Sequence, residues 1–155
     1  MFDVVDDAAY MQELLVEMLG EMGYEARTFT SAFEYLDFVH SDAFTEPLAV
    51  ISDVRMPQMG GYELMQSVQE IHPKIRFVMM TGESDIRDEY RNHACMYLGK
   101  PFDFNSLTRA IEAVGACASR GPSPELCRRV THNHEKFDVE GWSCPHPSDD
   151  AETVS

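Results

Sequence analysis

LAVISDVRMPQMGGYELM, residues 48–65, joins a buried strand to an amphipathic helix through a loop that begins at a carboxylate. Its first residues form a largely apolar run, which is typical of a strand covered on both faces of a sheet. Four apolar residues then recur at the spacing of one helix face: Leu64, Met65, Val68 and Ile71. The helix is expected to end before Pro73, because a residue that precedes proline disfavours the helical conformation. The segment therefore predicts a strand that ends near Asp53 and a helix that comes after it.

The same unit of strand and helix recurs along the chain. Further strands are expected at residues 2–6, 24–28, 75–80 and 96–99, and helices at residues 11–22, at residues 31–39 and from residue 103 onward. The second of these helices begins with Ser31 and Glu34 at the spacing of a capping box. Strict alternation with short links predicts an α/β fold, a doubly wound five-stranded parallel sheet with helices on both faces.

Composition narrows the classes of protein to which this chain can belong. With 155 residues, 44% of them hydrophobic and 25% charged, it has an ordinary soluble composition and room for one modest core. A net charge of −15 disfavours direct contact with nucleic acid and with anionic membranes. No stretch approaches the roughly 20 apolar residues of a membrane span, and the acidic N-terminus is unlike a secretory signal. We therefore expect a cytoplasmic protein with reduced cysteines.

The composition changes after the last expected helix. Residues 115–123 are rich in small residues, glycine and proline, and the residues beyond show no helical or strand period of useful length. We therefore predict a folded domain over residues 1–118 and a polar, flexible C-terminal tail over residues 119–155. Phe137 and Trp142 would anchor this tail to the domain.

Five potential metal ligands lie in the tail: Cys127, His132, His134, Cys144 and His146. Thiolate and imidazole groups suit Zn²⁺. Their spacing, C-x4-H-x-H-x9-C-x-H, matches no standard zinc finger. Two interpretations stay open, a Zn²⁺ site and a polar tail in which cysteine and histidine occur by chance.

Polar side chains lie at the ends of the expected strands. Asp6 and Asp7 close the first strand, Asp53 closes the third, and Thr81 and Lys100 come directly after the fourth and fifth. In a doubly wound sheet ligands collect at the carboxyl ends of the strands, so one site can gather all five residues. Three carboxylates in a small volume need a counter-charge, which a hard cation such as Mg²⁺ supplies. With a lysine, a threonine and a metal to neutralise the transferring oxygens, the set suits phosphoryl transfer to an aspartate.

Four motifs, in this order, carry a resemblance to a known family. They are VVDD at 4–7, ISDVRMPQMGGYELM at 51–65, MMTG at 79–82 and YLGKPF at 97–102. Through these motifs, residues 2–117 resemble the response-regulator receiver domains of two-component signalling, including the single-domain chemotaxis type. The resemblance implies the flavodoxin-like receiver fold and a signalling switch whose only catalysis is its own phosphorylation and slow dephosphorylation.

The resemblance also implies roles for the acidic residues. Asp53 would be the phosphoacceptor, and Asp6, Asp7, Asp53 and the backbone carbonyl of Arg55 would hold Mg²⁺, or Mn²⁺ in its place. A sensor histidine kinase or a histidine phosphotransfer protein would donate the phosphoryl group. Phosphorylation would change the affinity for a downstream effector protein, and the chain is expected to be a monomer or a weak homodimer.

Three further residues receive roles from the resemblance. Thr81 and Lys100 would bind the phosphoryl oxygens, and Tyr97 would be the switch aromatic, whose inward rotamer accompanies movement of the threonine. The bond between Lys100 and Pro101 would be cis, a conformation that proline makes accessible.

Two departures from the family pattern concern the readout and the lifetime of the phosphoryl group. Lys100 lies 19 positions after Thr81, about three fewer than we expect for the family, so that nearly one turn of the fourth helix would be missing. Either the output face is altered or a loop absorbs the deletion. Arg55 and Glu83 flank the expected path of the attacking water. We hypothesise that they pair and slow hydrolysis; the alternative is a surface ion pair of little energetic weight.

Two other functions are compatible with parts of the pattern. A phosphotransferase or phosphatase acting on small molecules would use the same aspartyl-phosphate chemistry, but such enzymes usually carry a cap domain and a DxD nucleophile loop, whereas residues 53–55 are DVR. Alternatively, a vestigial receiver would act as an adaptor through a metal-binding tail. The presence of all five polar residues at the strand ends argues against a vestigial site.

Overall fold

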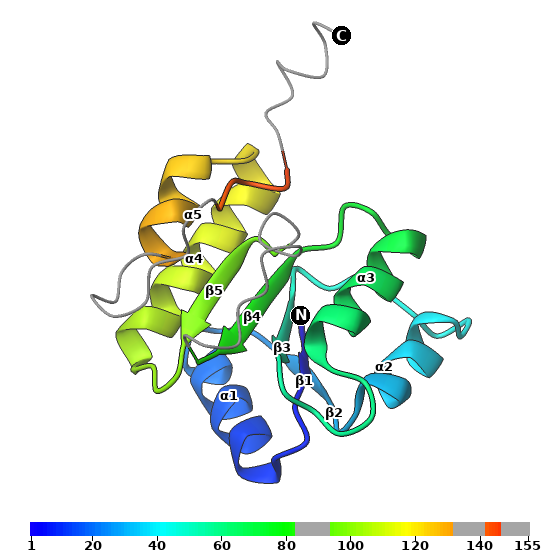
Figure 1. Cartoon of the computed structure of the whole chain (residues 1–155). Coiled ribbons are helices and arrows are strands. Elements are labelled where there is room, and N and C mark those ends of the chain that lie inside the picture. Colours follow the sequence, from blue (N-terminus) through cyan, green and yellow to red (C-terminus); the bar gives the residue numbers. More distant parts are fainter. Residues whose placement is uncertain (83–93, 132–141, 147–155) are drawn as a thin grey trace, which may run out of the picture.

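A five-stranded parallel sheet forms the centre of the protein in a computed structural model, which describes residues 1–82, 94–131 and 142–146 (Figure 1). The strands are β1 (Phe2–Val5), β2 (Ala26–Phe29), β3 (Val50–Asp53), β4 (Phe77–Thr81) and β5 (Met96–Gly99). Their order across the sheet is β2-β1-β3-β4-β5, so the direction in which strands are added reverses after β2. The predicted doubly wound α/β fold is confirmed.

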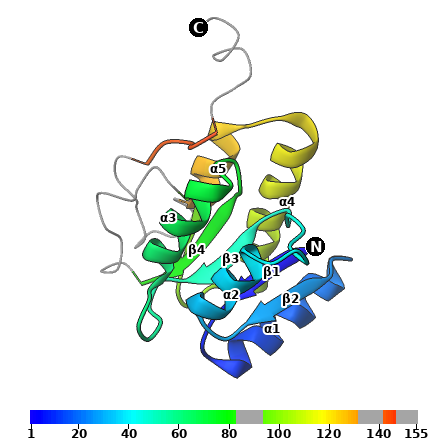
Figure 2. The same ribbon diagram turned by 90° about the vertical axis from the view of Figure 1, so that its right-hand side faces the viewer.

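Helices cover both faces of this sheet. They are α1 (Ala9–Glu21), α2 (Ala32–Val39), α3 (Gly61–Ile71), α4 (Phe104–Arg120) and α5 (Pro124–Thr131). Figures 1 and 2 show α1 and α4 on one face and α2 and α3 on the other. Because helices lie on both sides, every residue of β1, β3 and β4 is buried. No helix among the described residues is long and apolar enough to cross a membrane.

The start of α2 shows half of the predicted capping box. The Ser31 hydroxyl accepts a hydrogen bond from the Glu34 backbone N–H at 3.1 Å, as the motif requires. The Glu34 carboxylate reaches one residue further back than predicted and accepts from the backbone N–H and the hydroxyl of Thr30, at 2.9 and 2.6 Å. The backbone N–H groups at this end of the helix thereby gain partners that the helix itself cannot supply.

A buried charged network links β1, β2 and α2, and the sequence pattern did not predict it. Asp3 is fully buried and accepts hydrogen bonds from Arg27 Nε at 2.6 Å and from the Tyr35 hydroxyl at 2.7 Å. The Arg27 guanidinium also donates to the hydroxyl of Thr45 and lies 4.7 Å from the centre of the Phe38 ring. Asp3 and Arg27 are direct partners in the register between β1 and β2, which brings their side chains together.

The residues after α4 contain a helix, where the sequence predicted no regular element. Helix α5 packs against β5 and α4 (Figure 1). It is eight residues long and buries Cys127, Val130 and Thr131. A helix of eight residues has too few apolar positions on its buried face for the helical period to be recognised in the sequence. The predicted boundary between residues 118 and 119 also falls inside the last turn of α4.

Trp142 joins the C-terminal residues to the sheet. Its side chain is 2% exposed, and its Nε1 donates a hydrogen bond to the carbonyl oxygen of Ala94, just before β5, at 3.1 Å. The Arg128 guanidinium of α5 lies 5.7 Å from the centre of the Trp142 ring. Trp142 therefore anchors this part of the chain, as predicted, whereas Phe137 lies outside the described residues.

Candidate functional site

Asp53 is the last residue of β3 and lies at the carboxyl edge of the sheet, next to the point where the strand order reverses. Its side chain is close to a cation: Lys100 Nζ lies 3.0 Å from Asp53 Oδ1. Asp53 is 9% exposed and its side chain is 13% exposed, so its carboxylate remains within reach of solvent. An accessible carboxylate with one oxygen paired to an ammonium group can act as a nucleophile through the other oxygen.

Asp6 and Asp7, which come directly after β1, complete an acidic cluster with Asp53. Ligand oxygens from the three carboxylates all lie within 4.8 Å of one another. Asp6 Oδ1 accepts a hydrogen bond from the Ala8 backbone N–H at 2.8 Å, whereas Asp6 Oδ2 is buried and has no hydrogen-bond partner among the described residues. Burial, opposed by the Ala8 hydrogen bond and assisted by the Asp53 charge, raises the pKa of Asp6.

This donor set fits a hard divalent cation. Mg²⁺ binds carboxylate oxygens in proteins, and Asp6, Asp7 and Asp53 offer three of them. The Asp6 oxygen that has no partner among the described residues is buried within this cluster. A cation there would neutralise like charges and would supply the partner that Asp6 Oδ2 lacks within the described part of the chain. Arg55, whose carbonyl was the fourth predicted ligand, lies in the loop after β3 with an exposed side chain.

Thr81 and Lys100 meet where β4 and β5 end. The Lys100 backbone N–H donates to the Thr81 carbonyl oxygen at 2.9 Å, which ties the two strand ends together. Thr81 is 1% exposed, and its hydroxyl donates to the carbonyl oxygen of Gly82 at 2.9 Å. The peptide bond between Lys100 and Pro101 is cis, as predicted. Tyr97, three residues earlier on β5, is 1% exposed.

Two further residues shape the site, and the sequence analysis assigned them no role. Gly61, the first residue of α3, lies so close to β3 that a Cβ atom there would collide with the Asp53 carbonyl oxygen and lie 2.8 Å from Met79 Cε. Gln12 of α1 donates from its side chain to the carbonyl oxygens of Asp6 and Phe29, at 2.6 and 3.2 Å. The pair Gly60-Gly61 in the sequence can indicate that two backbone segments approach closely. The sequence around Gln12 contains no comparable signal of its contacts.

The described residues do not support a zinc site in the C-terminal part of the chain. The only group of three potential metal ligands found among them is the acidic cluster. Cys144 Sγ instead contacts the backbone N–H and carbonyl of His146, and burial raises the pKa of Cys127 to about 12. His132 and His134 lie outside the described residues. The alternative of an adaptor that acts through a metal-binding tail is therefore not supported.

Two expected departures from the family pattern also lie beyond the part of the chain that the structure describes. Residues 83–93 include Glu83 and the segment that would contain the shortened helix. The hypothetical pair of Arg55 and Glu83 and the effect of the shorter interval stay predictions.

An acidic cluster beside a lysine, at the carboxyl edge of a doubly wound sheet, is an arrangement that can hold a cation and an anionic group next to an aspartate. The comparison with known proteins agrees with this class: residues 3–112 match the response regulator receiver domain, and the chain belongs to that family. It is thus a receiver domain of the two-component signalling class. Receiver domains are signalling switches that interact with histidine kinases and downstream effectors, and they bind Mg²⁺ at an acidic pocket.

Similar proteins differ in how much of their length this chain matches. The chain is 32% identical over 141 residues to the DNA-binding transcriptional regulator NtrC of Escherichia coli strain K12, covering 89% of this chain and 29% of NtrC. It is 30% identical over 112 residues to the sporulation initiation phosphotransferase F of Bacillus subtilis strain 168, covering 70% of this chain and 88% of that protein. The chain therefore spans less than a third of the transcriptional regulator and most of the phosphotransferase.

A solved structure shows the same fold. The response regulator TrrA from Thermotoga maritima, in complex with Mg²⁺-BeF, superimposes with a TM-score of 0.61 at 28% sequence identity. The match covers 73% of this chain and 96% of TrrA.

Proposed function

We propose that Asp53 accepts a phosphoryl group from the phosphohistidine of a sensor histidine kinase or a histidine phosphotransfer protein, and that the modified chain changes its affinity for a downstream effector. The observation that carries this proposal is the 3.0 Å contact between Lys100 Nζ and Asp53 Oδ1 beside two further carboxylates. Asp53 would supply the nucleophile, and Lys100 would neutralise the transferred oxygens. The carboxylates of Asp6 and Asp7 are in position to hold a cation.

We propose the following steps for the transfer. A carboxylate oxygen of Asp53 attacks the phosphorus atom while the bond from phosphorus to the imidazole nitrogen of the donor breaks. The electron pair of that bond returns to the imidazole, which leaves as the neutral ring once it takes a proton from water. Lys100 stays beside the acceptor and stabilises the negative charge of the transferred oxygens.

Asp6, Asp7 and Asp53 would hold Mg²⁺, or Mn²⁺ in its place. When bound, the cation supplies positive charge that offsets both the acidic cluster and the incoming phosphoryl oxygens. The Mg²⁺-BeF complex of TrrA, a protein with the same fold, supports this assignment. The carbonyl oxygen of Arg55 is the fourth protein ligand that we propose.

Thr81 and Tyr97 would convert phosphorylation into a change of surface. The Thr81 hydroxyl donates only to the adjacent Gly82 carbonyl in the described part of the chain, so a phosphoryl oxygen can compete for it. Because the Lys100 backbone N–H binds the Thr81 carbonyl, movement of Thr81 is passed to the end of β5. Tyr97 lies on that strand, and α5 packs against it. We therefore propose that residues 1–118 are the receiver and that residues 119–155 take part in its readout.

Arg55 and Glu83 would set the lifetime of the phosphoryl group. We propose that the pair shields the phosphorus atom from water, so that Arg55→Ala shortens the lifetime of the phosphorylated form. The lifetime is measured from the decay of the phosphorylated mass after removal of the donor. An unchanged lifetime in Arg55→Ala contradicts this role and leaves the acceptor assignment intact.

Intact mass spectrometry after incubation with acetyl phosphate and Mg²⁺ tests the main proposal. The wild-type chain should gain the mass of one phosphoryl group, and Asp53→Asn should gain none. Asp103→Asn is the matched control, because it makes the same chemical change at an exposed helix cap where asparagine also serves. An undiminished gain in Asp53→Asn would overturn the assignment.

A further inference from the structure

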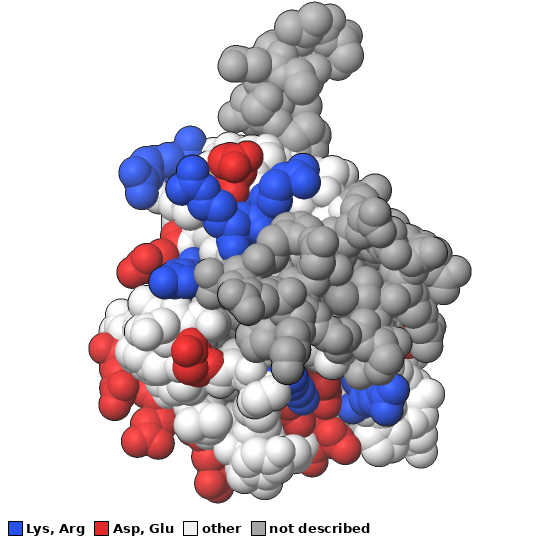
Figure 3. Space-filling model, turned by 60° about the vertical axis from the view of Figure 1, so that its left-hand side comes forward, with Lys and Arg blue, Asp and Glu red and all other residues white. Residues whose placement is uncertain are grey.

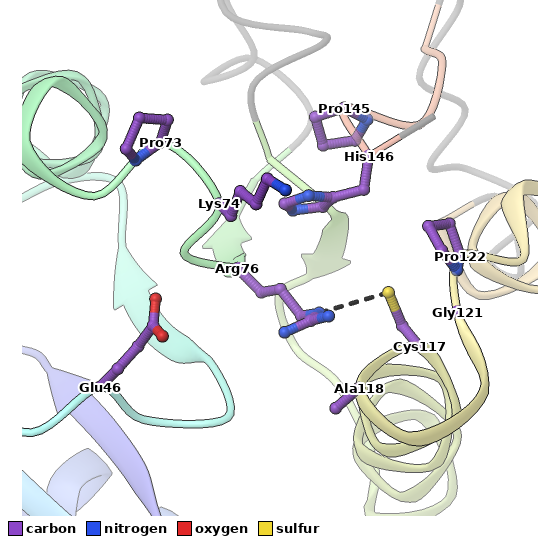
Figure 4. A pocket seen from close by; sticks show the side chains of 10 residues that line it. All are labelled: Glu46, Pro73, Lys74, Arg76, Cys117, Ala118, Gly121, Pro122, Pro145 and His146. Carbon is purple, nitrogen blue, oxygen red and sulfur yellow. Dashed lines mark hydrogen bonds between the residues drawn. The ribbon is translucent and has the colours of Figure 1, made fainter. Parts of the chain in front are cut away.

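A cavity of about 480 Å³ lies at the amino ends of the strands, at the edge of the sheet opposite to that of Asp53. Its walls come from two parts of the chain (Figure 4). Lys74 and Arg76, just before β4, and Cys117, near the end of α4, belong to the receiver. Pro122 and His146 belong to the segment after it. Residues from before and after the end of α4 therefore form the cavity together.

Three basic side chains converge on this cavity. Figure 4 shows Lys74, Arg76 and His146 directed into the same space, with Glu46 on the far side. Within the described residues neither Lys74 nor Arg76 forms an ion pair with a carboxylate, and the Arg76 Nε donates to the weak acceptor Cys117 Sγ at 3.3 Å. Guanidinium groups in proteins ordinarily face carboxylate or phosphate oxygens, so within the described residues Arg76 lacks its usual acidic partner.

The imidazole of His146 lacks a partner in the same place. Its Nε2 is buried and has no hydrogen-bond partner in the described part of the chain. Burial and the nearby charges of Arg76 and Lys74 lower the pKa of His146. A buried ring nitrogen is costly unless it is hydrogen-bonded, and a bound anion would supply the acceptor and offset the two cations.

The strongly acidic composition of the chain makes a cavity lined by basic side chains unusual. The chain carries a net charge of −15. Figure 3 nevertheless shows most of the visible Lys and Arg side chains gathered at the end of the molecule that carries α5, and most Asp and Glu at the opposite end. An anion is therefore repelled by most of the surface and attracted to this end.

We propose that the cavity binds a small organic phosphate, whose oxygens accept hydrogen bonds from Lys74, Arg76 and His146. Three donors that approach one space from different sides match the three terminal oxygens of a phosphate ester. The volume is within the range of small-molecule sites and exceeds the needs of a phosphate group alone. Because His146 comes from the C-terminal segment and Arg76 from the receiver, the ligand would also hold the two together.

Titration of the full-length chain with inorganic phosphate and with phenyl phosphate, in EDTA, tests the proposal. Calorimetry gives the affinity, and the fluorescence of Trp142, the only tryptophan and four residues from His146, is followed in parallel. We expect saturable binding, tighter for phenyl phosphate than for inorganic phosphate because the cavity has room for the ring. Arg76→Gln and His146→Gln should each weaken binding about tenfold. Lys74→Gln, at an exposed position, should also weaken binding.

Two controls separate this site from general electrostatics and from the phosphoacceptor. Arg129→Gln removes the same charge from α5 at a side chain that is 76% exposed and does not line the cavity, and it should leave the affinity unchanged. Asp53→Asn should bind phenyl phosphate like the wild type, so the two proposals fail independently. Absence of saturable binding, or an equal loss in Arg129→Gln or in Asp53→Asn, would overturn the proposal. Binding that appears only when Asp149 and Asp150 are both changed to Asn would also overturn it, since the chain's own carboxylates would then be the anion.

Discussion

Trp142 Nε1 donates a hydrogen bond to the carbonyl oxygen of Ala94, 48 positions earlier in the chain, at 3.1 Å. The contact places the C-terminal segment beside β5, the strand that also carries Tyr97 and ends next to Lys100. Residues outside the matched receiver region, 3–112, therefore contact the chain directly before this strand.

The first prediction concerns this anchor. Trp142→Ala should lower the free energy of unfolding by about 3 kcal/mol, because a buried ring and its hydrogen bond are both lost. Urea denaturation followed by circular dichroism measures the change. Trp142→Phe is the matched control, since it keeps most of the buried ring area and should cost about 1 kcal/mol. Equal stability of wild type and Trp142→Ala would show that the segment is not held on the receiver.

The second prediction concerns the buried network of Asp3. Arg27→Met should lower the free energy of unfolding by about 3 kcal/mol, because it leaves a fully buried carboxylate without its cation. Tyr35→Phe removes one hydrogen bond to Asp3 and should cost about 1 kcal/mol. Denaturation by urea measures both. The comparison variant is Arg129→Met, where an exposed arginine is lost and stability should stay within about 0.5 kcal/mol. A similar small effect for Arg27→Met would argue against the network.

The third prediction is a pH dependence at the start of α2. Hydrogen bonds from the Thr30 hydroxyl and backbone N–H lower the pKa of Glu34 below its ordinary value. A carboxyl with a lowered folded-state pKa adds stability above its unfolded-state pKa and loses it as the pH falls through the folded-state value. The free energy of unfolding of the wild type should therefore exceed that of Glu34→Gln by roughly 0.5 kcal/mol at neutral pH. This difference in stability should vanish in acid. Thermal unfolding across this pH range measures it, and a difference that grows in acid would be inconsistent with the assigned contacts.

The fourth prediction concerns Gly61. Gly61→Ala should lower the free energy of unfolding by about 2 kcal/mol, because the added methyl group collides with the Asp53 backbone. It should also reduce phosphorylation by acetyl phosphate, since the acceptor strand must shift. Gly20→Ala in α1 is the matched control: a Cβ atom there meets nothing within 4 Å, and the chain should gain about 0.5 kcal/mol. Normal stability and phosphorylation in Gly61→Ala would mean that α3 moves away freely.

The fifth prediction concerns removal of the cation. Asp6→Asn should raise the stability of the metal-free chain by about 1 kcal/mol, because it removes a buried charge from a cluster of like charges. We also expect Mg²⁺ to raise the melting temperature of the wild type and to leave that of Asp6→Asn unchanged. Differential scanning calorimetry with and without EDTA measures both effects. Asp42→Asn, at an exposed position, should change neither. A full Mg²⁺ effect in Asp6→Asn would remove Asp6 from the ligand set.

Local pattern was enough to predict the main elements. Residues 96–99 form β5 as predicted, and α4 begins at Phe104, one residue after the predicted start. Apolar runs predict buried strands because a strand covered on both faces must be apolar throughout, and this requirement acts over a few neighbouring residues. The shared location of Asp53, Thr81 and Lys100 was predictable as well, because parallel strands bring their carboxyl ends to one edge. Their roles in phosphoryl transfer stay predictions until the mass measurement is made.

Other features depend on partners that are distant in the chain. Helix α5 is too short to be stable alone and forms against β5 and α4. In the sequence, Asp3 is one polar residue within an apolar run. Its pairing with Arg27 depends on the register between β1 and β2. The cavity requires Arg76 and His146, 70 positions apart in the sequence, to face the same space.

The sequence by itself thus determined the sheet, its order of elements and the edge at which the acidic cluster forms. Tertiary structure alone decided where the C-terminal segment lies, which charges are buried and which basic groups share a cavity. The physical reason is the separation along the chain of the residues involved. Hydrophobic periodicity depends on residues that are close in sequence, whereas burial and electrostatic pairing depend on residues that are distant in sequence and adjacent in the fold.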